Sequence, residues 1–390
     1  MKFLEHISIN PPVPLKKGNL YPFVEMANVG VNRREPLQIA YKVFSSGVKF
    51  QDGDSVVARI EPCLQNGKKF FCHNIEAGFG STEYLVFRPK DDKIDSLYLY
   101  YFLQTDYIRK SMIGSMTGAT GRQRVNNAIF KSLEIEIPKI EIQKSIANIL
   151  SAYDNLIENN QKQIKLLEEA ALRLYKEWFV DLRFPGYETT PVVDGVPEGW
   201  RYRVVAEFGN IITGKTPSTS KPEYYGGTIP FVTIPDMHNQ VYPLLTEKTL
   251  TNTGANTQKN KFIPAKSILV SCIATVGLVN IAFEMCQTNQ QINSVVLFSE
   301  KDLYFVYESM LRIKDLLDGV GSNGATMTNV NKTKFSNIRI LCPPEPLIDA
   351  FYDWCMPVFE KIMTLSQSIL KAQQARDRLL PKLMSGEMEI

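Results

Sequence analysis

The stretch VNNAIFKSLEIEIP at residues 125–138 returns as VNKTKFSNIRILCP at residues 330–343, at a constant offset of 205 residues. A Gly-Ala-Thr triplet precedes each copy, at 118–120 and 324–326, and a long segment with apolar residues at helical spacing follows each copy. The matches inside the stretch do not fall at a helical period, so two unrelated helices would not produce them. The sequence therefore predicts a duplicated structural unit.

Length and composition indicate a two-domain globular protein. The chain has 390 residues, which exceeds what one core usually organises, and two domains of about 140 residues suit the usual size range. Hydrophobic residues make up 44% and charged residues 22%, which is enough to form two cores without a disordered tract. The net charge is only +3, so any contact with nucleic acid must come from a local basic patch.

The cysteine and histidine content argues against a metal centre. The six cysteines show no Cys-x-x-Cys spacing and the chain has three histidines, so we expect reduced thiols, no zinc site and no cofactor. The N-terminus lacks a basic-then-apolar signal pattern, and no apolar stretch approaches the ~20 residues that span a bilayer. We therefore expect a cytoplasmic protein.

The two halves of the chain share one order of elements. The first half combines short strand-like runs, set between Gly, Pro and Asn turns, with one helix expected at about 96–112. The second half repeats this order, with one helix expected at about 302–317. The fold class that follows is α+β, with two pseudo-symmetric domains separated by a pair of long helices.

Residues 141–181 contain no Gly and no Pro, and their apolar residues recur three and four positions apart. This spacing predicts a coiled-coil helix, which at 1.5 Å per residue would be roughly 60 Å long. An equivalent stripe covers about 347–385, where we expect Pro357 to kink or delay the start of the helix and Gly386 to cap its end. Because both stripes must be buried, we expect the two helices to pair antiparallel.

The order of these elements divides the chain into five expected segments. The first long helix carries the chain from one domain to the other, and the second leaves the second domain with an equivalent stripe to bury. The segments are a first domain at 1–138, a central long helix at 139–183, a linker at 184–200, a second domain at 201–343 and a C-terminal long helix at 344–390.

Residues 209–216 match Gly-x-x-x-x-Gly-Lys-Thr, the string of a nucleotide-binding phosphate loop. A phosphate loop needs a helix directly after the Lys-Thr pair, because the N–H groups of the helix N-terminus hold the phosphates. Pro217 and Pro222 follow instead, and they remove backbone donors. The string favours an ordinary loop, although an enzyme that binds a nucleotide through Gly-Lys-Thr at 214–216 stays an alternative.

Two further motifs resemble catalytic ones only in part. Asn-Pro-Pro-Val at 10–13 resembles the Asn-Pro-Pro-aromatic loop of amino-methyltransferases, but Val13 replaces the aromatic residue that stacks on a flipped base. Asp-Asp-Lys at 91–93 is the nearest approach to a nuclease cluster, and it is typical of a solvated turn. No Ser, His and Asp set suggests a triad. The sequence therefore indicates no catalytic residues and favours a protein that is not an enzyme.

Polar and basic loops recur in both domains and are the candidates for DNA contact. Arg and Lys can bond to guanine edges, Asn and Gln to adenine edges, and Lys to phosphates. Alone, such loops are typical of any solvated surface, but their recurrence in a duplicated chain favours DNA; one more lies at 322–324. The side chains expected to contact DNA are Lys68, Lys69, Arg122 and Arg124 in the first domain, and Lys259, Lys261, Gln290 and Gln291 in the second.

Several segments resemble the specificity subunit of type I restriction-modification systems. They are EIQKSIANILSAYDNLI at 141–157, VPEGW at 196–200, TGKTPS at 213–218, YYGGTIPF at 224–231 and RLLPKLMSGE at 378–387. The resemblance covers nearly the whole chain and explains the Gly-Lys-Thr string, because a Gly-x-Thr-Pro-Ser turn is the family's usual opening of a recognition domain. The first domain departs from this pattern and begins with Asn-Pro-Pro-Val, so the sequence does not give its register against the second domain before about Ser55.

The resemblance implies a non-catalytic DNA-binding subunit with two target-recognition domains. Each domain would read one half of a bipartite, asymmetric sequence, and the paired helices would set the unread spacer. The implied partners are double-stranded DNA, two modification subunits that carry the methyl donor and the adenine-methylating site, and restriction subunits with an ATP-driven motor. A pseudo-twofold subunit offers two equivalent docking surfaces, which accounts for two modification subunits. A free-standing DNA-binding regulator built from the same domains is a second alternative.

Overall fold

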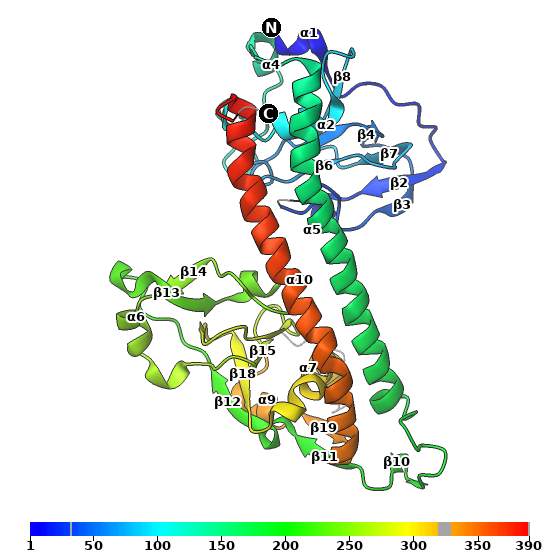
Figure 1. The fold of residues 1–390 in the computed structure, drawn as a ribbon, viewed down its shortest axis with the longest axis vertical. Helices are drawn as coiled ribbons and strands as arrows, with labels where there is room; N and C mark the ends of the chain where they lie inside the picture. Colours follow the sequence, from blue (N-terminus) through cyan, green and yellow to red (C-terminus); the bar gives the residue numbers. More distant parts are fainter. Residues whose placement is uncertain (32, 319–328, 389–390) are drawn as a thin grey trace. The chain divides into compact units, whose positions relative to one another are not determined.

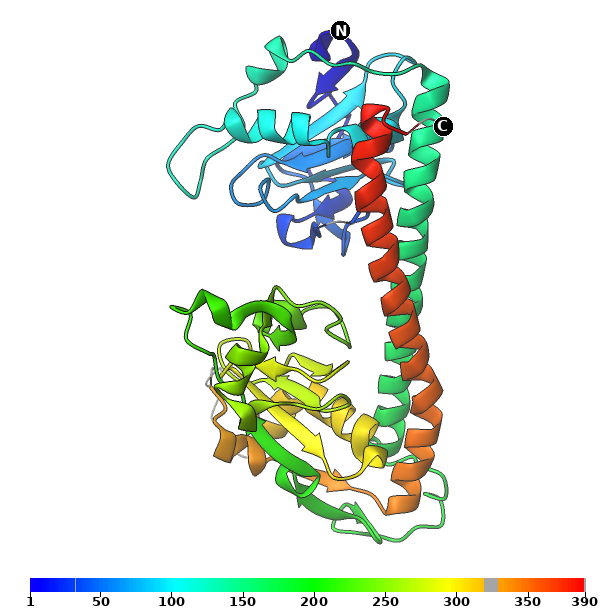
Figure 2. The ribbon, with the colours of Figure 1, turned by 60° about the vertical axis from the view of Figure 1, so that its left-hand side comes forward.

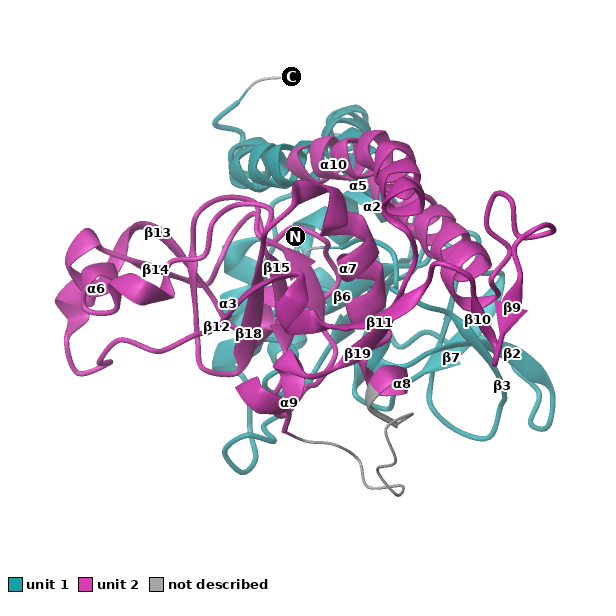
Figure 3. Ribbon diagram, turned by 90° about the horizontal axis from the view of Figure 1, so that it is seen from below, with its two compact units in different colours: residues 1–159, 368–390 teal, residues 160–367 magenta. Residues whose placement is uncertain are grey.

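The chain forms two compact units in the computed structural model, which describes residues 1–31, 33–318 and 329–388 (Figure 1). One unit comprises residues 1–159 and 368–390, and the other comprises residues 160–367 (Figure 3). Each unit therefore combines one β-rich domain with parts of both long helices. Over the described ranges, no helix is both long enough and apolar enough to cross a bilayer.

Two four-stranded sheets form the β-rich domain of the first unit. Their strands are β1 (Ile7–Ile9), β2 (Leu20–Val24), β3 (Ala40–Val43), β4 (Val48–Gln51), β5 (Ser55–Ala58), β6 (Lys69–Phe71), β7 (Ala77–Gly80) and β8 (Tyr84–Pro89). One sheet has the order β1-β8-β5-β6 and is antiparallel throughout. The other has the order β3-β2-β7-β4, in which β2 and β7 are parallel.

The second unit repeats this design. Its strands are β12 (Gly209–Thr213), β13 (Tyr225–Val232), β14 (Lys248–Leu250), β15 (Ile268–Ser271), β16 (Val279–Ile281), β17 (Gln287–Thr288) and β18 (Ile292–Leu297). An antiparallel sheet has the order β12-β18-β15-β16, and a second sheet has the order β14-β13-β17 with β13 and β17 parallel. The α+β class and the duplication expected from the sequence are confirmed.

Strand pairing aligns the two domains where their sequences do not. Ile9 pairs with Phe87 in the first domain, and Ile211 pairs with Val295 in the second. The central strands β8 and β18 also have the same pattern of four buried and two half-buried side chains. Ile9 therefore corresponds to Ile211, and the Asn-Pro-Pro-Val motif occupies the place of Ile-Thr-Gly-Lys at 212–215.

Short helices lie beside the sheets. The single helix expected at 96–112 is wrong, because Thr105 is extended and separates α2 (Ser96–Phe102) from α3 (Asp106–Gly114). The helix expected at 302–317 is likewise divided, at Arg312, into α7 (Leu303–Leu311) and α8 (Ile313–Asp318). The remaining short elements include α1 (Phe3–His6), α4 (Ile129–Ser132), α6 (Asn252–Asn256), α9 (Lys332–Ser336), a π-helical turn (Lys176–Val180), β9 (Val192–Val193) paired with β10 (Val196–Pro197), and β11 (Arg201–Val204) paired with β19 (Arg339–Cys342).

The two long helices are α5 (Ile140–Tyr175) and α10 (Glu345–Ser385). Within each unit their segments run antiparallel, as expected (Figures 1 and 2). Gly386 has a φ of 74° directly after α10, the conformation of a C-terminal cap. The expectation that Pro357 delays the helix is wrong, because α10 already begins at Glu345. Its other early proline, Pro346, lies in the first turn, where no helical N–H bond is lost.

The repeated stretch is buried in the same way in both units. Val125 and Val330 are each 1% exposed, and Phe130 and Phe335 are fully buried. These side chains belong to the main core of their own unit, which also contains apolar residues of the long helices. The sequence match therefore reflects two cores of one design. The second Gly-Ala-Thr triplet and the polar loop at 322–324 lie outside the described residues.

Candidate nucleic-acid interface

A turn at 117–124 presents Arg122 on the surface of the first domain. Thr117 and Arg124 exchange two backbone hydrogen bonds, with N···O distances of 3.0 and 2.9 Å. Gly121 closes the turn with a φ of 81°, which residues with side chains rarely adopt. Within the described residues, no hydrogen bond or ion pair holds the exposed Arg122 guanidinium. This side chain is therefore accessible to a nucleic acid.

Arg124 stabilises the C-terminal end of this turn. Its guanidinium forms a bidentate ion pair with Glu83, in which Nε lies 2.9 Å from Oε2 and Nη2 lies 2.8 Å from Oε1. A second carboxylate, that of Glu61, accepts a hydrogen bond from the Gly121 N–H at 2.9 Å. The two glutamates thus fix the turn that carries Arg122.

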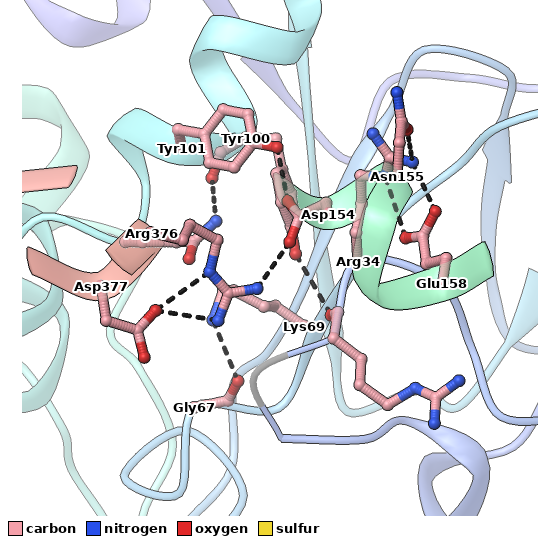
Figure 4. A network of polar contacts seen from close by, with 12 residues as sticks. Arg34, Gly67, Lys69, Tyr100, Tyr101, Asp154, Asn155, Glu158, Arg376 and Asp377 are labelled. Atoms are coloured by element: carbon pink, nitrogen blue, oxygen red, sulfur yellow. Dashed lines mark hydrogen bonds and ion pairs between the residues drawn. The ribbon is translucent and has the colours of Figure 1, made fainter. Parts of the chain in front are cut away.

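Lys68 directly precedes β6 and Lys69 is its first residue, and both amines bond to backbone carbonyls. Lys68 Nζ donates to the Met26 oxygen at 2.9 Å, and Lys69 Nζ lies 3.4 Å from the Gly67 oxygen. Burial, together with the positive charge of Arg376, lowers the pKa of Lys69 to about 8. Lys69 lies in a polar cluster beside the long helices (Figure 4).

In the second domain, Gly-Lys-Thr at 214–216 forms an extended loop after β12. A side chain at Gly214 would meet the Thr288 carbonyl oxygen at 2.3 Å, so this close approach requires glycine. The Lys215 N–H donates to the same oxygen at 2.9 Å. In this described segment the next element is only a 3-10 helix at Pro222–Tyr224. The helix that would hold phosphates does not follow, which disfavours the nucleotide-binding alternative.

Three loops meet at one polar surface of the second domain. The Thr216 hydroxyl donates to Gln290 Oε1 at 2.7 Å, and the Gln258 amide donates to the Lys215 oxygen at 2.7 Å. Buried Gln258 precedes a 3-10 helix at Lys259–Lys261, where Lys259 is exposed and Lys261 is half-exposed. The contacts therefore gather four of the predicted positions, Lys259, Lys261, Gln290 and Gln291, around one loop.

Buried amides support this polar surface. Gln287 is fully buried; its Oε1 accepts a hydrogen bond from Gln258 at 2.8 Å, and its amide donates to the Ala255 oxygen at 3.0 Å. Half-buried Gln291 accepts from the Asn289 amide at 3.0 Å, whereas Gln290 is exposed. The sequence predicted neither Gln258 nor Gln287 as a site residue. Gln258 directly precedes the predicted Lys259 in the same polar loop, and Gln287 lies three residues before the predicted Gln290.

A buried polar cluster lies in the first unit, where both long helices meet the domain (Figure 4). Arg376 Nη1 lies 2.5 Å from Asp154 Oδ1, and the Tyr101 hydroxyl donates to Asp154 Oδ2 at 2.5 Å. The side chains of Arg376 and Asp154 are only 6% and 3% exposed. Burial and the Asp154 carboxylate raise the pKa of Tyr101, while the same carboxylate raises the pKa of Arg376 against the effect of burial.

A second ion pair lies beside the first. Arg34 Nη2 lies 2.5 Å from Glu158 Oε2, and Arg34 Nε lies 3.1 Å from Glu158 Oε1. The same guanidinium donates to Asn155 Oδ1 at 2.6 Å. The sequence did not predict either ion pair, because the partners in each pair are distant in sequence. The available signal was a charged residue inside an apolar helical stripe, as at Asp154.

The acidic motif at 91–93 forms a turn, as expected. Asp91 Oδ2 lies 2.8 Å from His6 Nδ1, and Asp91 Oδ1 accepts from the Lys93 N–H at 3.1 Å. Nowhere in the described part of the chain do three or more His, Cys, Asp or Glu side chains form a group that could hold a metal ion. The polar loops remain the candidate site.

Comparisons with known proteins agree with this architecture. A family model described as "Type I restriction modification DNA specificity domain" matches residues 12–169 and 197–346. The type I restriction enzyme HindI specificity subunit of Haemophilus influenzae is 33% identical over 402 residues, which span 86% of each protein. The MjaIX specificity subunit of Methanocaldococcus jannaschii is 29% identical over 77% of this chain and 71% of its own length.

A solved structure shows the same fold. The crystal structure of a type I restriction-modification system S subunit from M. genitalium matches 98% of this chain and 95% of its own, with a TM-score of 0.56 and 14% sequence identity. The first region matched by the family model covers β2 to β8 and most of α5, and the second covers β11 to β19. Together with the duplicated sheets and the antiparallel long helices, these matches show that the chain belongs to the family of type I restriction-modification specificity subunits.

Proposed function

We propose that this chain is the DNA sequence-recognition subunit of a type I restriction-modification complex, in which each domain reads one half of a bipartite, asymmetric target. The observation that carries the proposal is the double match to a DNA specificity domain, one match on each half of the chain. One four-stranded sheet has the same order in both domains, and the second sheets share three strands, so each domain has equivalent loops to offer to DNA. The side chains of equivalent loops differ, as with Thr82 and Gln290 shortly before β8 and β18, which would give two different half-sites.

We assign the target-recognition domains to residues 1–138 and 201–343. The long helices are assigned to residues 139–183 and 344–390, and the linker to residues 184–200. The helices would set the length of the unread spacer between the two half-sites. A duplicated subunit also offers the same surface twice, which supports docking of two modification subunits. Restriction subunits would complete the complex.

In this proposal the chain itself is non-catalytic. Methyl transfer would take place in the modification subunits, and DNA cleavage would take place in the restriction subunits. The chain would contribute sequence selection and geometry, bound to double-stranded DNA in the cytoplasm. Neither a cofactor nor a metal ion is part of the role proposed for this chain.

The predicted contact residues differ in how accessible their side chains are. Arg122, Lys259 and Gln290 are exposed, so DNA can reach their side chains, and Gln290 Oε1 also accepts a hydrogen bond from Thr216. We therefore expect these three to contribute most to DNA binding. The others are half-exposed or bonded to protein groups, and they stay predictions: Lys68, Lys69, Arg124, Lys261 and Gln291.

Mapping of adenine methylation in the host genome tests the proposed function. The map is recorded with the gene intact, deleted and restored, in a strain that expresses active modification subunits. The expected result is loss and return of one bipartite motif. An unchanged map in that strain would contradict the proposal.

The two alternatives predict different behaviour of the purified chain. A nucleotide-binding enzyme would bind labelled ATP and lose that binding in the Lys215→Ala variant. A free-standing regulator would bind one duplex tightly without any modification subunit. We expect neither result, because the loop at Lys215 lacks the required helix and the chain belongs to a family of complex subunits.

A further inference from the structure

The buried pair of Asp154 and Arg376 joins two helices from different halves of the chain. Asp154 lies on α5 and Arg376 lies on α10, 222 residues away. Both side chains are almost completely removed from water, and their charged atoms lie 2.5 Å apart. A buried charge is tolerated only when it is paired, so each helix depends on the other at this position.

The duplicated positions of the second unit carry apolar residues. At the repeat offset of 205 residues, Asp154 corresponds to Phe359 and Arg376 corresponds to Ala171. Both are fully buried in the main core of the second unit, where the Phe359 ring lies 5.4 Å from that of Tyr307. The ion pair of one unit is thus replaced by apolar packing in the other.

Two further cations near the pair, Lys69 and Arg34, also correspond to apolar residues of the second unit. Lys69 pairs with Val57 across β6 and β5, and Val279 pairs with Val270 at the same place in β16 and β15. The Arg34 carbonyl accepts from the Phe71 N–H at 2.9 Å, and that of Val241 accepts from the Ile281 N–H at 2.8 Å. The cations Lys69 and Arg34 therefore correspond to buried valines, Val279 and Val241.

This asymmetry bears on which helices can pair. Two copies of α5 paired in the same way would bring Asp154 opposite Ala171 at both ends. Two copies of α10 would bring Arg376 opposite Phe359 at both ends. We call a pair of two copies of the same helix a like pair. Each like pair would bury two charged side chains that have lost their main partner, which is strongly unfavourable.

Neighbouring charges would compensate only in part. The Arg34 guanidinium interacts with Asp154, but it is already paired with Glu158. Lys69 interacts with the Asp154 carboxylate, but its amine bonds to the Gly67 oxygen and its pKa is lowered to about 8. Asp377 accepts two hydrogen bonds from Arg376 and would accompany it into a like pair, but its side chain is 51% exposed and therefore screened by water.

We propose that Asp154 and Arg376 make the two halves of the chain selective for each other. The first domain accepts α10 and rejects a second copy of α5, and the second domain accepts α5 and rejects a second copy of α10. If each domain reads one half-site, which rests on the proposed function, this selectivity keeps the target asymmetric, because a like pair would present one domain twice.

Fragment exchange in a cleaved full-length chain tests the selectivity. A protease site is placed between Glu188 and Thr189, in an exposed part of the linker, and the purified chain is cleaved into fragments 1–188 and 189–390. Two preparations with different tags are mixed, unfolded in urea and refolded. Native mass spectrometry then counts mixed pairs, which contain one fragment of each kind, and like pairs.

The parent chain and a variant with both apolar replacements should give different results. The parent should form mixed pairs in at least about tenfold excess over like pairs, because a like pair leaves two buried charged side chains without their ion-pair partner. The double variant Asp154→Phe/Arg376→Ala, which gives the first unit the residues of the second, should form like pairs at a much higher share. A double variant of two exposed cations on the same helices, Arg173→Ala/Lys371→Ala, should behave as the parent does.

A second variant keeps the test valid if the first variant fails to fold. Asp154→Asn/Arg376→Gln removes both charges while keeping the side-chain sizes similar, and it should also raise the share of like pairs. If the parent already forms like pairs freely, or if both uncharged variants keep the parent's excess of mixed pairs, the proposal is wrong. Neither result bears on DNA recognition, because the readout is fragment pairing.

Discussion

The first unit buries ion pairs at positions where the second unit buries apolar side chains, although both units share the order of one four-stranded sheet and contain antiparallel segments of the two long helices. Asp154 and Arg376 stand where the second unit has Phe359 and Ala171. Replacing a buried ion pair by well-packed apolar groups is often neutral or stabilising, so the ions are not needed for a stable core. The second unit shows directly that this fold forms without them. We therefore infer that the buried pair of Asp154 and Arg376 serves the choice of partner helix rather than the stability of the core.

The second unit buries a titratable carboxyl at another place. At an offset of 206 residues Tyr101 matches Tyr307, so Glu308 corresponds to Phe102. Glu308 is 1% exposed, and burial together with Glu168 raises its pKa to about 8. Within the described residues, Glu308 Oε2 has no hydrogen-bond partner. The second unit therefore buries a carboxyl with a raised pKa, where the first unit has the apolar Phe102.

Removing one partner of the ionic cluster should have the largest effect. Arg376→Ala leaves Asp154 buried without its main partner, and we expect a loss of about 3–5 kcal/mol in the free energy of unfolding. Urea unfolding of the full chain measures this loss. The exposed neighbour Arg378 provides the control, because Arg378→Ala should change stability by no more than ~0.5 kcal/mol. Equal effects of the two substitutions would show that the buried pair is not formed.

Unfolding stability measured over a pH series tests whether Glu308 of the second unit is protonated in the folded chain. The pKa of Glu308 is raised from 4.5 to about 8 in the folded chain, so the folded state holds more protons than the unfolded state between these values. Stability should therefore fall as pH rises through this window. Glu308→Gln removes the effect, and its stability gain over the parent should grow by on the order of a few kcal/mol between about pH 5 and about pH 9.

Urea unfolding at the two pH values measures the effect of Glu308→Gln. Glu223→Gln, at an exposed carboxyl of the same unit, is the matched control and should show no such trend. A stability difference between parent and Glu308→Gln that is the same at both pH values would mean that Glu308 is not protonated in the folded chain.

At the DNA surface, Arg122→Ala should weaken the assembled complex for its cognate duplex by ~1–3 kcal/mol if Arg122 reads a base. The loss should be confined to duplexes with the correct first half-site. Fluorescence anisotropy with a panel of single-base variants measures it. Arg173→Ala, an exposed arginine on α5, is the control, and an equal loss from both substitutions would remove Arg122 from the recognition surface.

The smallest expected effect belongs to Lys259. As a phosphate contact, Lys259→Ala should weaken binding to all sequences alike and lower the slope of log affinity against log salt by about 1. A salt titration with cognate and random duplexes measures the slope. An unchanged slope with a sequence-dependent loss would instead make Lys259 a base contact.

The duplication and the long helices could be predicted because their apolar residues repeat at fixed intervals and fill two equivalent cores, as with Phe130 and Phe335. The opening of the first domain could not be aligned, because its match to the second domain depends on strand pairing at Ile9 and Ile211. The ionic cluster was missed for a similar reason. Its charges become partners only when segments 222 residues apart meet.

Each domain is proposed to read its own half of the target, and methylation mapping with one substitution in each domain can separate the two halves. Strains that carry Arg122→Ala or Gln290→Ala are compared with the parent strain for the methylated motif. We predict that Arg122→Ala relaxes only one half of the bipartite motif and that Gln290→Ala relaxes only the other half. Relaxation of the same half by both substitutions would contradict the account.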